Sequence, residues 1–253
     1  MSKNLDILAK LLATENITIR RSVKAETASF DLKNRVLTLP ILKVTTGDIM
    51  DMMTGHEVGH ALWTPIEMLE RAQKENIEFS FVNVLEDVRI EKKVQTKYLG
   101  SVKVFNRGYK ELASNNFFGT KGQDISKLNL IDRINLHYKH FVDISFSDAE
   151  MVWVKKSNQT ITPDDVLELA KELYDYIQSN PESQGEEPAE SDLNDDIQAM
   201  MGPSDPLGQE ENSGDSDGDM DSSGDSSDEG DESSEGASDG KSSDDGGSEE
   251  TET

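Results

Sequence analysis

Hydrophobic and polar positions follow two different periods in the first part of the chain. Residues 5–12 repeat apolar side chains at helical spacing, whereas residues 17–23, 28–32 and 35–42 alternate in part and are rich in β-branched side chains. Alternation of this kind is typical of strands with one buried face, and a polar turn separates the last two segments. The pattern predicts a short helix followed by a small antiparallel sheet.

Beyond this sheet, apolar positions recur every three to four residues, which predicts helices. Thr64 before Pro65 is biased away from helical angles and predicts that one helix ends near Trp63. Thr162 followed by Pro163 has the N-cap and first-position chemistry of a helix start. The predicted fold class is therefore α+β and mainly α. The predicted helical segments are 48–63, 66–76, 79–94, 102–112, 127–141, 147–154 and 163–177.

The last part of the chain has a different composition. From residue 180 onward Ser, Gly, Asp and Glu dominate, and residues 182–253 hold 26 of the 51 acidic residues but only one of the 25 Lys and Arg residues. Such a segment cannot bury enough apolar surface to offset its ordering entropy. We therefore predict a folded domain over residues 1–179 and a disordered acidic tail over residues 180–253.

The predicted folded domain is nearly neutral, because the tail accounts for almost all of the formal net charge of -26. No strongly basic surface is expected, so nucleic-acid binding is not indicated. No apolar run is long enough to cross a bilayer, and the chain has no cysteine, which excludes disulfides and thiolate metal sites. These features predict a cytoplasmic protein with no nucleic-acid or membrane partner.

The candidate chemistry centres on His56-Glu57-Val58-Gly59-His60, which reads H-E-x-x-H. Two histidines four apart on a helix point the same way and can hold one metal ion. Glu57 can then reach a water bound to that metal and act as general base, which is the arrangement of a zinc hydrolase. The flanking residues are largely apolar and predict a buried helix. The alternative is a helix whose histidines bind nothing, because short matches also arise by chance.

A third ligand is expected from the predicted helix 79–94. Asp87 and Glu91 are four apart on one face, together with Asn83. One of these two carboxylates can bind the metal while the other, with Asn83 on the same face, accepts the N–H of a ligand histidine and orients it. Glu86 is rotated by about 100° from Asp87 and is the alternative ligand. A solvated acidic face that pairs with neighbouring Lys and Arg residues is the other interpretation.

These two motifs resemble those of known families. His56-Glu-Val-Gly-His60 with Leu85-Glu-Asp-Val-Arg-Ile-Glu91 is similar to the metallopeptidase-like N-terminal half of the CobT family, which comprises cobaltochelatase subunits and phage-encoded relatives that end in a von Willebrand A domain. The second motif also resembles the Glu-Glu-x-x-x-Glu helix of dipeptidyl peptidase III, a gluzincin. The resemblance covers roughly residues 40–100, and no von Willebrand A domain is expected in this sequence.

The resemblance implies a zincin-like fold in which His56, His60 and Asp87 bind Zn²⁺ and Glu91 orients a ligand, with Asp87 standing where the gluzincin helix has Glu. In zincin-type folds an edge strand beside the site can pair with an extended peptide, and residues 35–42 are the candidate, unless that strand only packs. In gluzincins a His or Tyr from a later helix often stabilises the oxyanion. His137 and Tyr138 are the candidates for this role, although a histidine on such a helix is more often structural.

Two functions are compatible with these motifs. The first is a zinc metallopeptidase that hydrolyses a peptide or protein substrate through a zinc-bound water activated by Glu57. The second is a non-catalytic CobT-like subunit that works with a MoxR-type AAA+ ATPase, in a cobaltochelatase-related or phage assembly role. A von Willebrand A domain on another chain is a further possible partner. For a phage-encoded chain, the expected location is the host cytoplasm.

Overall fold

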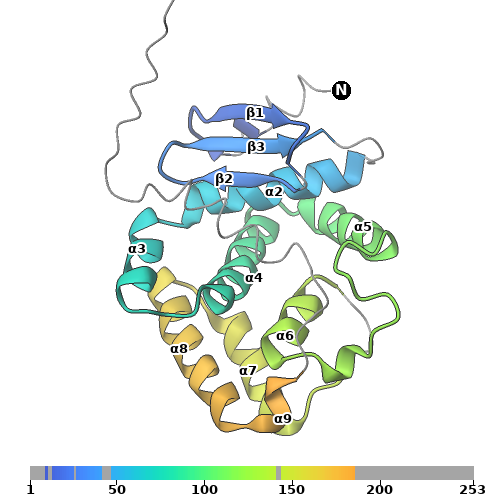
Figure 1. Ribbon diagram of the computed structural model, residues 1–253. Coiled ribbons are helices and arrows are strands. Elements are labelled where there is room, and N and C mark those ends of the chain that lie inside the picture. Colours follow the sequence, from blue (N-terminus) through green and yellow to red (C-terminus); the bar gives the residue numbers. More distant parts are fainter. Residues whose placement is uncertain (1–8, 11–12, 26, 42–46, 141–143, 186–253) are drawn as a thin grey trace, which may run out of the picture. The chain divides into compact units, whose positions relative to one another are not determined.

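The protein is described by a computed structural model that covers residues 9–10, 13–25, 27–41, 47–140 and 144–185 (Figure 1). The chain divides into two units, residues 1–207 and 208–253, and every described residue belongs to the first. Most of the predicted helix 5–12 and the predicted tail beyond residue 185 lie outside the described residues.

Three strands precede a series of helices, so the fold is α+β and mainly helical, as the sequence predicts. The strands are β1 (Thr18–Ser22), β2 (Ser29–Asp31) and β3 (Val36–Pro40). The helices are α2 (Gly47–Trp63), α3 (Ile66–Lys74), α4 (Phe79–Lys97), α5 (Ser101–Ser114), the 3₁₀ turn η1 (Ile125–Lys127), α6 (Leu130–Tyr138), α7 (Asp148–Gln159), α8 (Pro163–Ser179) and α9 (Pro181–Gln184).

The sheet is mixed, so the prediction of an antiparallel sheet is wrong. Its strand order is β1-β3-β2, with β3 antiparallel to β2 and parallel to β1. Only the β2–β3 connection is a tight turn, in which Asn34 donates hydrogen bonds from its backbone and its side chain to Asp31. The β1–β2 connection is longer, because β2 lies on the far side of β3 from β1. The chain runs back along β2 and then forms β3 between the two, parallel to β1.

The position of β3 also overturns the predicted role of residues 35–42 as an edge that pairs with a peptide. Both sides of β3 are occupied, by β1 and by β2. β2 ends the strand order and contacts α2, so among the described residues it is the strand with an unpaired edge on the side of α2.

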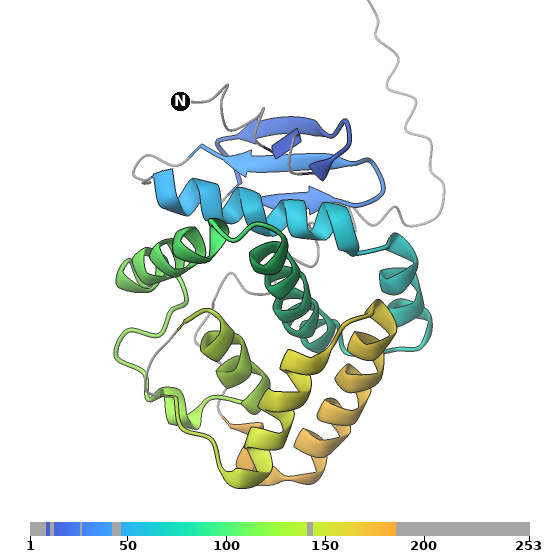
Figure 2. The same cartoon turned by 180° about the vertical axis from the view of Figure 1, so that it is seen from behind.

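Helix α2 is the centre of this unit. It packs against β2 on one side and against α4 and α5 on the other (Figures 1 and 2). α4 in turn contacts α6, α7 and α8. The run from Met52 to Ala61 in α2 is buried without interruption. A helix buried on every side has no solvated face, so its polar side chains need partners inside the protein.

Two glycines allow the neighbouring helices to approach α2 closely. A Cβ on Gly59 would lie 2.8 Å from Ile90 Cδ1 and 3.0 Å from Val94 Cγ2 of α4. A Cβ on Gly108 of α5 would lie 2.7 Å from Met52 Cβ. Both α4 and α5 are therefore seated directly against the helix that carries H-E-x-x-H.

The later helices follow the predicted pattern with one extension. Thr162 caps α8 and Pro163 opens it, as the sequence predicts. Residues 180–185, which the sequence assigns to the tail, are described and include α9, where Ser183 is buried. Within the described ranges, no helix has both the length and the apolar character needed to cross a membrane.

Candidate metal centre

The two histidines of α2 lie one turn apart within its buried run. His56 is 7% exposed and His60 is fully buried. Their Nε2 atoms are 3.2 Å apart, and the rings meet edge to face with centroids 4.9 Å apart. The i, i+4 spacing therefore brings two ring nitrogens to one point.

Asp87 of α4 completes a group of three ligand atoms. Its Oδ1 lies 3.5 Å from His56 Nε2 and 3.3 Å from His60 Nε2, so the three atoms form a nearly equilateral triangle. A tetrahedral zinc ion with bonds of about 2.0–2.1 Å places its ligand atoms about 3.3 Å apart. The group therefore fits such an ion. Among the described residues, no other cluster of three or more His, Cys, Asp or Glu side chains offers a metal site.

Glu91 of α4 lies behind His56, in the orienting position that the resemblance to gluzincins implies. His56 Nδ1 is 2.9 Å from Glu91 Oε1. Burial alone would raise the pKa of Glu91, but Lys139 and His56 outweigh it and hold this pKa below its ordinary value. The ionised carboxylate offers only lone pairs, so His56 Nδ1 carries the hydrogen and donates it. His56 Nε2 is then left with a lone pair that faces Asp87.

A relay of three side chains lies behind His60. Arg89 donates to both oxygens of Glu86, at 2.7 and 2.6 Å, and the Thr64 hydroxyl donates to Glu86 Oε1. Because its hydrogen is used on the carboxylate, Thr64 can only accept from His60 Nδ1, which is 3.0 Å away. His60 Nε2 is therefore also left with a lone pair.

Glu86 does not fit the role of alternative ligand. Its carboxylate is held by Arg89 and Thr64, on the side of His60 away from the ligand atoms. The rotation between neighbouring residues of a helix is the reason, because it turns Glu86 away from the face that carries Asp87. Glu86 instead helps to orient His60 from behind.

Three lone pairs consequently point into one buried volume. Asp87 Oδ1 receives no hydrogen bond among the described residues, and electron-rich atoms this close repel one another unless a cation lies between them. A proton is the smallest such cation. Burial lowers the pKa of His56, but Asp87 and Glu91 outweigh this effect and raise the pKa to about 9. The shift shows how strongly this point attracts positive charge.

Lys139, just after α6, and Tyr109 of α5 close the far side of the group. Lys139 Nζ donates to Asp87 Oδ2 at 3.0 Å, to Glu91 Oε1 at 2.7 Å and to Tyr109 Oη at 2.9 Å. Tyr109 in turn donates to Glu91. All three hydrogens of the ammonium are used, and Asp87 is left with Oδ1 alone for a metal ion.

The charges of the group leave room for a divalent cation. With both imidazoles neutral, Asp87, Glu91 and Glu57 contribute three negative charges, and Lys139 contributes one positive charge. Buried groups with an excess of two negative charges are costly, whereas an ion of charge +2 makes the sum zero.

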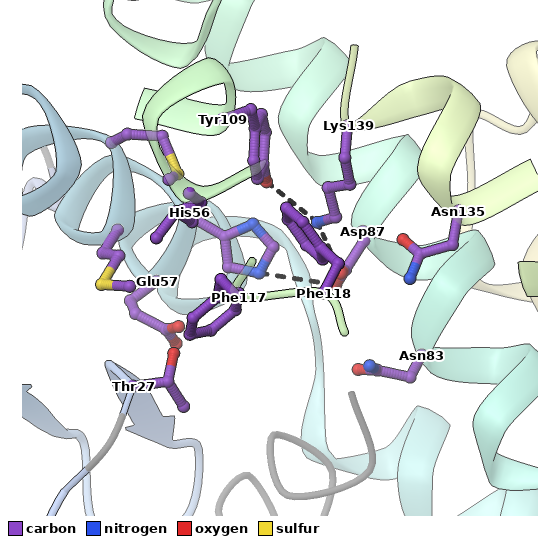
Figure 3. Close-up of a pocket in the computed structure, with 13 residues that line it drawn as sticks. Thr27, His56, Glu57, Asn83, Asp87, Tyr109, Phe117, Phe118, Asn135 and Lys139 are labelled. Carbon is purple, nitrogen blue, oxygen red and sulfur yellow. Dashed lines mark hydrogen bonds and ion pairs between the residues drawn. The ribbon is translucent and has the colours of Figure 1, made fainter. Parts of the chain in front are cut away.

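A cavity of about 50 Å³ opens beside the ligand atoms and is lined by His56, Asp87 and Glu57. This volume is enough for a few water molecules. Glu57 is 3% exposed, and Figure 3 shows its carboxylate turned toward Thr27, the residue two before β2. The H-E-x-x-H spacing thus places a carboxylate in the same small space as the ligand atoms.

The predicted oxyanion residues lie elsewhere. His137 is exposed and packs its ring against Phe146, while the Tyr138 hydroxyl donates to the carbonyl of Val154. Neither residue lines the cavity. The phase of α6 is the reason, because Asn135 and Lys139 are four apart and share the face turned toward the site, which leaves His137 on another face.

Sequence reasoning missed three groups and misplaced a fourth. Thr64 lies four residues after His60, so the helical period alone could have found it. Lys139 and Tyr109 come from other helices, and no local spacing points to them. Asn83, expected behind a ligand histidine, lines the cavity instead.

The resemblance to the CobT family and to gluzincins stays a prediction from the two sequence motifs that lie on α2 and α4. A scan against protein-family models, a search of curated proteins and a search of solved structures each find no match to this chain.

Proposed function

We propose that this protein is a zinc-dependent hydrolase of peptide bonds in which His56, His60 and Asp87 hold the metal. One observation carries the proposal. The three ligand atoms lie 3.2 to 3.5 Å apart in a buried site, and the hydrogen bonds behind both imidazoles turn lone pairs toward the same point. Hydrogen bonds behind the ligands thus hold the three ligand atoms in a geometry that is preorganised for a metal ion.

The donor set favours zinc in a catalytic setting. Imidazole and carboxylate are common zinc ligands, and three protein ligands are typical of catalytic sites, whereas structural sites use four. Bound there, zinc would supply a Lewis acid that polarises a carbonyl oxygen. The adjacent cavity provides the space for a reacting group.

Glu57 is the proposed general base. Its carboxylate lines the cavity together with His56 and Asp87, and the fixed helix geometry keeps it beside the first ligand. It takes a proton from the attacking water and passes it to the leaving amine, a contribution of about 10²–10⁴-fold for a positioned acid–base group.

The edge of β2 is the proposed place for an extended substrate. In the part of the chain that the structure describes, β2 is paired on one side only, and Thr27, just before it, lines the cavity. A peptide that adds to an exposed strand edge gains main-chain hydrogen bonds independent of its sequence. This edge replaces the one that the sequence assigned to residues 35–42.

The test compares the purified full-length chain with two variants. We expect about one zinc ion per chain by elemental analysis and cleavage of fluorescent casein. Glu57→Gln should keep the zinc and lose activity by about 10²–10⁴-fold, whereas His60→Ala should lose both. Absence of zinc from the wild-type chain, or full activity in Glu57→Gln, would contradict the proposal.

The predicted partners, a MoxR-type ATPase or a von Willebrand A chain, stay predictions. The same variant separates the two functions suggested by the sequence. A complex with such an ATPase whose biological activity is unchanged by Glu57→Gln would favour the non-catalytic subunit.

A further inference from the structure

Two asparagine side chains line the cavity without a hydrogen-bond partner in the described residues. Asn135 of α6 is 3% exposed, and its carboxamide makes no hydrogen bond within the described ranges. Asn83 of α4 is half-buried and is likewise without a partner there. Neither carboxamide has an atom that is both fully buried and unpartnered, so within the described ranges their polar atoms are open to the cavity and available to a bound group.

The two carboxamides face the reacting space from the side opposite Glu57. Figure 3 shows Glu57 with Thr27 on one side of the cavity and Asn83 with Asn135 on the other. Asn83 precedes Asp87 by one helical turn, and Asn135 precedes Lys139 by one turn, so both are held on the faces that build the metal centre. Their backbone positions are therefore set by the same two segments that place Asp87 and Lys139.

The chemistry of the cavity selects a neutral partner. Each carboxamide offers both donors and an acceptor. Lys139, the cation that lines this cavity, has all its hydrogens committed to Asp87, Glu91 and Tyr109. Apart from the metal, a substrate carboxylate would find no uncommitted cationic side chain among the described residues that line the cavity, whereas a peptide N–H and C=O would find an acceptor and donors.

An apolar wall completes the cavity. It is formed by Met52, Met53, Leu112, Phe117 and Phe118. With about 50 Å³ of space, the cavity accepts only a few heavy atoms, which suits a small apolar side chain next to the recognised group.

We infer that Asn83 and Asn135 bind an internal peptide group of the substrate, next to the scissile bond and beside a small apolar side chain. This inference rests on the proposed function and specifies it. The enzyme cleaves within chains and does not recognise a free C-terminal carboxylate.

The experiment uses the zinc-loaded full-length chain and three hydroxamates. Acetohydroxamate probes the metal alone, and two succinyl hydroxamates end in an N-methylamide or in a carboxylate. By calorimetry, we expect the methylamide to bind at least about tenfold tighter than the carboxylate, because a site built for hydrogen bonds rejects a ligand that leaves them unpaired. Equal affinities, or tighter binding of the carboxylate, would overturn the inference.

The variants Asn135→Leu and Asn83→Leu should abolish this preference and leave zinc content and acetohydroxamate binding unchanged. Asn158→Leu, at an exposed position outside this cavity, is the matched control and should keep the preference. If Asn135→Leu does not fold, the result for Asn83→Leu tests the inference, because position 83 is half-buried and tolerates the substitution better. A preference that survives in the folded variants would overturn the inference.

A failure of zinc or acetohydroxamate to bind would count against the proposed function alone. The metal-free chain is then titrated with N-acetylalanine N-methylamide and with N-acetylalanine, and the side-chain amide signals of Asn83 and Asn135 are followed by NMR. Shifts with the methylamide alone support the inference. No shift, or the same shift with both probes, overturns it.

Discussion

Two clusters of buried charge in this protein differ in one respect. Arg133 of α6 and Glu150 of α7 form a closed pair, in which Arg133 also donates to the carbonyls of Leu128 and Ser145, and Glu150 also accepts from Ser147. Donors and acceptors match, and the charges cancel. At the metal centre, acceptors converge on one point and negative charge is in excess. Burial alone therefore does not mark a functional site, whereas unmatched lone pairs do.

The largest expected effect comes from removing charge at the convergent point. Asp87→Asn keeps the shape of the side chain but makes it neutral. We expect zinc affinity to fall by more than about 100-fold, beyond the 10–100-fold loss typical of groups behind a ligand. Competition with a chromogenic chelator measures this. Unchanged affinity would mean that Asp87 is not a ligand.

Glu150→Gln tests the closed cluster. Loss of one partner leaves the Arg133 guanidinium buried beside a neutral amide, so we expect the free energy of unfolding to fall by about 3 kcal/mol. Urea denaturation measures the change, and zinc affinity should stay the same. Glu172→Gln is the control, because its ion pair with Lys156 is exposed and contributes less than about 1 kcal/mol.

Thr64→Val probes the relay behind His60. The variant keeps the shape but cannot accept from His60 Nδ1, so the imidazole loses the bond that sets its tautomer. We expect zinc affinity to fall by about 10–100-fold. Thr160→Val, at another buried threonine whose hydroxyl donates to the carbonyl of Ser157, should leave it unchanged. An equal loss in both variants would indicate a general effect of burial.

The smallest effect is expected at the protein surface. Hydrogen bonds from Lys171 and Arg71 lower the pKa of Glu75 from 4.5 to about 2. Because the folded pKa is depressed, this stabilisation is present above pH 4.5 and is lost as the pH falls toward 2. The difference in Tm between the wild type and Glu75→Gln should therefore be small at pH 7 and vanish near pH 2. A difference that grows on acidification would contradict this assignment.

Helical spacing predicted the parts of the site that lie within single helices. His56 and His60, and then Asp87 and Glu91, follow from side chains four residues apart on one face, and the structure brings these pairs together. The order of the strands could not be predicted in the same way. The polar turn between β2 and β3 predicts that these two strands pair as a hairpin. No residue pattern within β1 or beside it indicates that β1 pairs with the other side of β3.

Groups that reach the site from other helices also escaped prediction. Lys139 and Tyr109 contact Glu91 because α5 and α6 dock against their neighbours, which is a property of packing between distant segments. The resemblance to gluzincins, in which a His or Tyr of a later helix has this role, pointed instead to His137 and Tyr138. Their exposure and their contacts depend on the phase of α6, which places Lys139 on the inner face.

Gly59 implies a stricter signature than H-E-x-x-H. A Cβ at position 59 would lie 2.8 Å from Ile90 Cδ1 and 3.0 Å from Val94 Cγ2, so a side chain there would force these residues of α4 to shift. We expect a larger residue to increase the separation between α4 and α2. Asp87 Oδ1 would then lie farther from the Nε2 atoms of His56 and His60. Chains that keep this convergence of two imidazoles and a carboxylate should therefore be sought with the pattern His-Glu-x-Gly-His. In chains with a bulky residue before the second histidine, we expect the carboxylate to come from another direction or to be missing.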